Sequence, residues 1–219
     1  MKPKNLETEL RNLLDFLMNN DLAVDANPVD VRAVYPATRI TWKSPNPALM
    51  TGGEFATLDN YFSIASAKAY SAFLYDGGIL QISYDFKRND VVGHRLAFYP
   101  CPFEVDEDAF VFTPILDVLD QYRLNGEKYL RLRSPLRFDF DQKGAKTGHP
   151  TVHLHVIRQR CRCAVVAPLS LGHFIRFVFY HFYPFSWQAH EYLREYPQVL
   201  GKRTITVPEE THLHLGCSR

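Results

Sequence analysis

Three β-rich runs in the middle of the chain constrain the fold more than any other feature. They cover residues 69–75, 78–87 and 91–99, with short polar connections between them. In the second run Leu80 and Ile82 alternate with Gln81 and Ser83, which is typical of a strand with one apolar face. The Asp-Gly pair at 76–77 favours a tight hairpin turn. We therefore expect an antiparallel meander.

Helical patterns flank these strands. Leucines recur at helical spacing near the N-terminus, so we predict a helix over residues 6–19 with Asn5 as its N-cap. Pro114 suits the first turn of a second helix over 115–124, and Ser170 suits the N-cap of a third over 171–183. We also predict a polar helix over 187–195 and a strand over 31–42, whereas residues 58–68 fit either helix or strand.

Residues 128–141 and 151–157 form a second β pattern, with mostly apolar side chains at the even positions. Strands grouped together, rather than alternating strictly with helices, favour an α+β fold. We expect a mainly antiparallel sheet, made of a meander plus a hairpin and packed with several helices. The 219 residues fit a single domain over 1–219.

The charge balance excludes some function classes. Lys plus Arg total 25 and Asp plus Glu total 24, which is too even for a globally basic nucleic-acid coat protein. The hydrophobic share of 46% also excludes a disordered chain. We found no signal peptide and no apolar run long enough to span a membrane, and the four cysteines are too few for a disulfide scaffold. We expect a cytoplasmic protein without membrane contact.

Strand alternation collects reactive side chains on one sheet face. If the even residues of the hairpin face the core, Arg137 and Asp139 share the opposite face with His153 and His155. The short connection 142–150 brings His149 near them. These five are our candidate catalytic residues.

The chemistry of this cluster has three interpretations. A histidine can transfer protons while an aspartate orients it, and an arginine can hold a phosphate. Alternatively, two histidines and an aspartate can bind a transition metal, and the His-x-His pair of His212 and His214 can complete a four-histidine shell. The third interpretation is an ordinary solvated or partner-covered face. We assign no metal site, and the cofactor is left unknown.

Arginines near the cluster indicate a nucleic-acid contact. Arg131 and Arg133 precede the cluster in the first hairpin strand, and Arg158 and Arg160 follow the second. Such a basic band suits a phosphate backbone, although scattered surface arginines are the alternative. The sequence lacks a Gly-rich phosphate loop, a dinucleotide fingerprint, a Gly-x-Ser-x-Gly elbow and a His-Glu-x-x-His helix.

Three stretches carry a family resemblance: HRLAFYPCP at 94–102, RFDFD with HPTVHLH within 137–155, and FIRFV with FYP within 174–184. Over roughly residues 74–187 the chain resembles a bacterial family known as domain of unknown function 2290. The resemblance implies a prokaryotic source and motifs centred on the same Arg/Asp/His segment, but no reaction. Many such families occur in defence or mobile-element loci.

From these observations we expect a small nucleic-acid-cleaving enzyme, a ribonuclease or toxin-like effector with a role in antiviral defence. One alternative is a non-catalytic binding subunit of a bacterial multi-protein defence complex, and another is a His-ligated metalloprotein. The expected partner is RNA or a protein encoded nearby.

Overall fold

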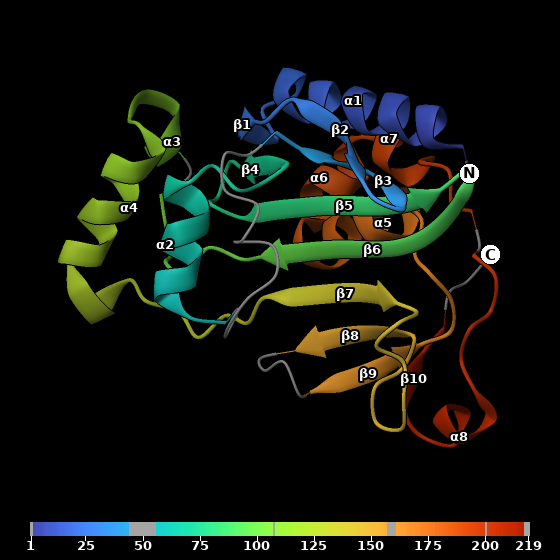
Figure 1. Ribbon diagram of the computed structural model, residues 1–219. Helices are drawn as coiled ribbons and strands as arrows, with labels where there is room; N and C mark the ends of the chain where they lie inside the picture. The colour runs from blue at the N-terminus through green and yellow to red at the C-terminus, as the bar shows by residue number, and fades with distance from the viewer. Residues whose placement is uncertain (1, 44–55, 107, 157–160, 200, 217–219) are drawn as a thin grey trace.

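One ten-stranded sheet organises the computed structural model (Figure 1). The structure describes residues 2–43, 56–106, 108–156, 161–199 and 201–216. Within them the strands are β1 (Ala23–Ala26), β2 (Val29–Val34), β3 (Ala37–Trp42), β4 (Ala72–Leu74), β5 (Ile79–Lys87), β6 (Asp90–Tyr99), β7 (Leu136–Asp141), β8 (Val152–Val156), β9 (Arg162–Val165) and β10 (His214–Leu215).

The main path of the sheet runs β1-β4-β5-β6-β7-β8-β9-β10, and β3 also pairs with β5 and β2. All the pairs are antiparallel except β9 with β10. The expected meander is β4-β5-β6 and the expected hairpin is β7-β8. Because β6 pairs with β7, the two units form one continuous surface, and the α+β fold is confirmed.

Helices lie on both faces of this sheet. They are α1 (Pro3–Asn19), α2 (Leu58–Ser66), α3 (Ala109–Phe112), α4 (Ile115–Leu124), α5 (Leu171–Phe182), α6 (Pro184–Ala189), α7 (Glu191–Arg194) and α8 (Val207–Glu210). The Ser170 hydroxyl accepts a hydrogen bond from the backbone N–H of His173, so the predicted cap of α5 is confirmed. In Figure 1, α2, α3 and α4 lie beside the end of β5 and β6.

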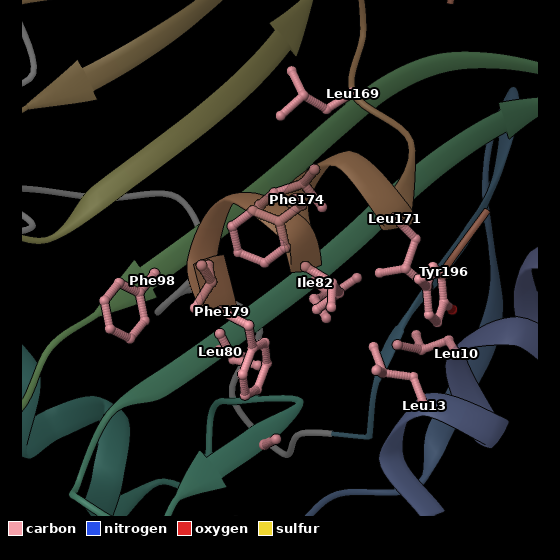
Figure 2. Packing of buried hydrophobic residues seen from close by; sticks show 14 of the residues in the cluster. Leu10, Leu13, Leu80, Ile82, Phe98, Leu169, Leu171, Phe174, Phe179 and Tyr196 are labelled. Carbon is pink, nitrogen blue, oxygen red and sulfur yellow. The ribbon is translucent and has the colours of Figure 1, made fainter. Parts of the chain in front are cut away.

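The first face of the sheet carries the larger hydrophobic core. Figure 2 shows Phe174 and Phe179 of α5 close to Leu80 and Ile82 of β5, with Leu10 of α1 nearby. All five side chains are fully or almost fully buried. The apolar face of β5 and the leucine face of α1 therefore pack into one core, as the sequence patterns of both elements predict.

The second face is divided between an apolar and a polar part. Ile79, Ala97 and Tyr99 pack in a smaller core with buried side chains of α2 and α4. Farther along the same face, polar and charged side chains of β5 to β9 line a cavity. The functional candidates lie on this polar part.

Several predicted element bounds are wrong. The strand predicted over 31–42 is a hairpin, because the chain turns at Tyr35 and Pro36 between β2 and β3. The strand predicted over 128–141 begins only at Leu136; residues 126–128 form a 3-10 turn instead. The predicted polar helix over 187–195 is split between α6 and α7.

Other corrections concern helix starts. The first helix begins at Pro3 with Lys2 at the N-cap, so Asn5 lies inside it; proline is well tolerated in a first turn. The segment 58–68, which fits helix or strand by sequence, forms α2, where the Thr57 hydroxyl accepts from the backbone N–H of Asn60. Among the described residues, every helix is too short or too polar to cross a bilayer.

Candidate functional site

One row of side chains crosses the polar face through Asp139. Arg95 of β6 lies directly opposite Asp139 of β7, and Asp139 lies directly opposite His153 of β8. Opposed residues on neighbouring strands point to the same face, so the row brings these three side chains together. Arg95 Nε donates a hydrogen bond to Asp139 Oδ1 at 3.1 Å.

A second row adds Arg137 and His155, which are opposite each other on β7 and β8. Arg137 Nε donates to Asp139 Oδ2 at 3.0 Å. His155 Nε2 lies 3.3 Å from the same carboxylate oxygen. Asp139 is therefore the centre of the cluster, with two guanidinium groups and one imidazole around its carboxylate.

The two imidazole rings lie in a T-shaped arrangement, with an interplanar angle of 73°. His153 Nε2 lies 2.9 Å from His155 Nε2, and His153 Nδ1 lies 2.7 Å from the carbonyl oxygen of Pro150. A carbonyl oxygen only accepts, so His153 Nδ1 carries the proton in this contact. In a neutral ring, His153 Nε2 then presents its lone pair toward His155.

The cluster is buried, so its four members do not form the solvated face that one of the three interpretations described. Relative exposure is 8% for Arg137, 7% for Asp139, 1% for His153 and 2% for His155. Buried charged groups are costly unless they are paired and hydrogen-bonded, as the Asp139 carboxylate is here. The predicted pairing of the two strands is confirmed, and Arg137, Asp139, His153 and His155 come together as predicted.

Burial and neighbouring charges shift the titration of these groups. Burial acts to raise the pKa of Asp139, but the His155 hydrogen bond and the charges of Arg95 and Arg137 outweigh it and hold this pKa below its usual range. Burial, with His155 adding to it, lowers the pKa of His153 to about 4. At neutral pH the cluster therefore contains an ionised Asp139 and a neutral His153.

A cavity of about 660 Å³ opens in front of the cluster. Six cationic side chains line it: Arg39, Lys87, Arg95, Arg137, Lys143 and Arg162. Three carboxylates line it as well: Asp85, Asp139 and Asp141. Counted without the histidines, six positive and three negative charges leave a net charge of +3. Such a surface attracts anions.

His149 lies at the rim of the cluster rather than in it. Its ring centroid is 4.7 Å from that of His153, and it lines the same cavity. Its backbone is held by paired hydrogen bonds with Lys146 in the short loop between β7 and β8. Partial burial lowers its pKa, and the charge of Arg162 contributes.

Two arginines of the predicted band, Arg131 and Arg133, lie apart from the cluster. Arg131 pairs with Glu104, and Arg133 Nη1 donates to the carbonyl oxygen of Cys101 at 3.0 Å. Both lie before β7 begins, so strand alternation does not place them on the cluster's face, and neither lines the cavity. Arg158 and Arg160 lie outside the described residues.

Three ligand-type side chains lie close enough to hold a metal ion. One oxygen of Asp139 and one nitrogen each of His153 and His155 all lie within 4.8 Å of one another. The alternative of a four-histidine shell is not met among the described residues, because β9 lies between β8 and β10 and separates His214 from His153. His212 and His214 are absent from this metal-capable group within the described chain.

The sequence argument missed most of the cavity's positive charge. Arg39 and Lys87 come from β3 and β5, and Arg95 comes from β6. Alternation in the run 91–99 signals Arg95, since it shares a face with Ala97 and Tyr99 rather than with Leu96. Its pairing with Asp139 depends on which strand neighbours β7, and a single sequence does not reveal that neighbour.

Comparison with known proteins identifies the family of the chain. No curated protein matches the chain, and no solved structure matches it. The family model described as an uncharacterized conserved protein, DUF2290, matches residues 22–217, which include every strand from β1 to β10. The chain therefore belongs to the DUF2290 family.

Proposed function

We propose that this protein is an enzyme that cleaves phosphodiester bonds of nucleic acid, with RNA as the preferred substrate. One observation carries the proposal: a buried Arg/Asp/His cluster forms the wall of a cavity in which positive charges outnumber negative ones two to one. The cavity volume lies in the range of ordinary ligand sites, roughly 300–1,000 Å³.

The unpaired part of the positive charge favours a phosphate ligand. Arg39 forms a bidentate pair with Asp85 at 2.6 and 2.7 Å, and Asp139 accepts from two arginines. Within the described chain, no ion pair involves Lys87, Lys143 or Arg162. Arg162 Nε is buried and has no hydrogen-bond partner there, and an anionic oxygen in the cavity would supply one.

The cluster has the groups that phosphodiester cleavage needs. His153 or His155 would act as the general base on the attacking oxygen or as the general acid that protonates the leaving oxygen, Asp139 would orient it, and Arg137 would stabilise charge developing on the phosphorane. RNA is favoured because its 2′-hydroxyl is an internal nucleophile next to the scissile phosphate. We also propose that the protein is cytoplasmic and that it originates from a defence or mobile-element locus.

The test offers labelled single-stranded RNA and DNA of one sequence to the purified chain, with and without added divalent metal. We expect wild-type protein to cleave RNA and His155→Ala to lose at least about 100-fold in rate. His212→Ala is the matched control, because this histidine is exposed and lies outside the cavity. It should cleave at the wild-type rate.

Two outcomes would contradict the proposal: no cleavage by wild-type protein, or equal cleavage by wild type and His155→Ala. Salt-dependent binding of nucleic acid without cleavage would instead support the alternative of a non-catalytic binding subunit.

A further inference from the structure

Two histidine nitrogens and one carboxylate oxygen converge on one point of the polar face. His153 Nε2 and His155 Nε2 are 2.9 Å apart, and His155 Nε2 is 3.3 Å from Asp139 Oδ2. Metal–nitrogen bonds are about 2.0–2.1 Å, so two ligands on one ion lie roughly 3.3 Å apart in a tetrahedral site and roughly 3 Å apart at right angles. These two separations match those of neighbouring ligands on one ion, and the ligand atoms of His153 and Asp139 lie within 4.8 Å of each other.

The hydrogen bond of His153 orients this ring for coordination. Its Nδ1 is held 2.7 Å from the Pro150 carbonyl oxygen, so Nε2 presents the lone pair. Metal-binding histidines usually donate their second ring N–H to a backbone carbonyl or a carboxylate. The loop 142–150 connects β7 to β8, and its Pro150 carbonyl oxygen thereby fixes the orientation of the His153 ring.

The carboxylate is oriented in the same way. Arg95 on the neighbouring strand β6 holds Asp139 Oδ1, and Arg137, two residues before Asp139 on β7, holds Oδ2. Their charge weakens the attraction for a cation, yet it also keeps Asp139 ionised and fixes its rotamer. Each carboxylate oxygen has two lone pairs, so Oδ2 can accept from Arg137 and coordinate an ion at once.

The donor set selects the class of metal. Magnesium and calcium prefer oxygen ligands, whereas imidazole favours first-row transition metals such as zinc and iron. Three protein donors leave at least one coordination position open, as in catalytic rather than structural sites. All three side chains line the cavity, so the open position is accessible to a ligand there.

We propose that Asp139, His153 and His155 form a binding site for one first-row divalent transition-metal ion, zinc or iron in class. As the cofactor of the nuclease, this ion rests on the proposed function; with both imidazoles bound to it, the ion in place of a free histidine would activate the attacking oxygen. Metal binding itself is measured without nucleic acid, so the two proposals can fail separately.

The experiment uses full-length chain purified without a histidine tag and stripped with a chelator. Cobalt(II) is the probe, followed by its visible absorption and by equilibrium dialysis. We expect one cobalt ion per chain, displaced by zinc. His155→Ala and Asp139→Asn should each weaken binding by at least about tenfold.

The matched control is His212→Ala with His214→Ala, which removes the chain's other His-x-His pair. It should bind cobalt as wild type does. Circular dichroism checks the fold of each variant. X-ray absorption on zinc-loaded wild-type protein gives a second measurement that needs no substitution, and it should show two imidazole ligands and no sulfur.

Absence of stoichiometric binding by wild type, equal binding by the cluster variants, or sulfur ligation to Cys161 and Cys163 would overturn the metal site. Cobalt binding as expected, together with no nucleic-acid cleavage, would leave the site standing and remove the proposed nuclease function.

Discussion

Arg95 and Asp139 lie opposite each other on β6 and β7 and are joined by a hydrogen bond of 3.1 Å. The arginine belongs to the meander and the aspartate belongs to the hairpin. This contact connects the two β units at the centre of the candidate site, and the first prediction concerns its strength.

Arg95→Gln should destabilise the folded chain by roughly 1–3 kcal/mol, because a buried carboxylate loses one of its two guanidinium partners. The Asp139 side chain is 10% exposed, so water replaces the lost partner poorly. Urea unfolding at neutral pH measures the change. Arg11→Gln, which removes an exposed ion pair with Glu7, should cost no more than about 1 kcal/mol; equal losses in both variants would contradict the prediction.

His94 should make the fold sensitive to mild acid. Burial lowers its pKa to about 4 from the usual histidine value of about 6.5, and its Nε2 accepts a hydrogen bond from the backbone N–H of Leu169. The unfolded chain therefore takes up the proton at higher pH than the folded chain does. The contribution of His94 to the free energy of unfolding is fully present above about pH 6.5. It falls as the pH decreases toward 4, by up to about 3 kcal/mol.

Urea unfolding of wild type and His94→Gln at about pH 7.5 and about pH 4.5 separates this contribution from that of His153. The wild type should lose more stability than the variant between these two conditions. The same loss in both proteins would show that His94 does not carry the effect.

Gly172 permits a close approach of α5 to the chain near Pro197. A Cβ atom at this position would lie 2.0 Å from the Pro197 carbonyl oxygen. Gly172→Ala should therefore destabilise the protein by about 1–3 kcal/mol through overpacking. Thermal unfolding measures it against Gly216→Ala, whose Cβ would meet nothing within 4 Å. A Gly172→Ala midpoint as high as that of the control would refute the close contact.

His149 should matter less to nucleic-acid cleavage than His155 does. It is half-buried at the rim, and the Asp139 carboxylate is held by other side chains. We expect His149→Ala to reduce the cleavage rate by about tenfold or less, against at least about 100-fold for His155→Ala. Rates under single-turnover conditions decide this; a larger loss at His149 would move the reactive centre to the rim.

Strand alternation alone was enough to predict the face shared by Arg137, Asp139, His153 and His155, because the period of two is a local property. Their burial was not predictable in this way, since it depends on the cavity walls contributed by other strands. Alternation was misleading for Arg131 and Arg133, which alternate with leucines as strand residues do but lie before β7. The chain there forms hydrogen bonds with the carbonyl oxygens of Pro102, Cys101 and Phe103 instead.

The hairpin at Tyr35 and the neighbour of β7 were missed for different reasons. Proline at 36 was a turn signal inside an otherwise β-rich run, so the correct boundary was present in the sequence. The pairing of β6 with β7 spans the segment that contains α3 and α4. Such long-range pairing has no local pattern, and it is what brings Arg95 into the site.

The backbone hydrogen bonds between β6, β7 and β8 set the spacing of every member of the cluster, independently of the contacts between their side chains. Removing one side chain should therefore leave the positions of the others nearly unchanged. The side chains that carry the donor atoms can therefore be exchanged one at a time, while the three strands stay in place.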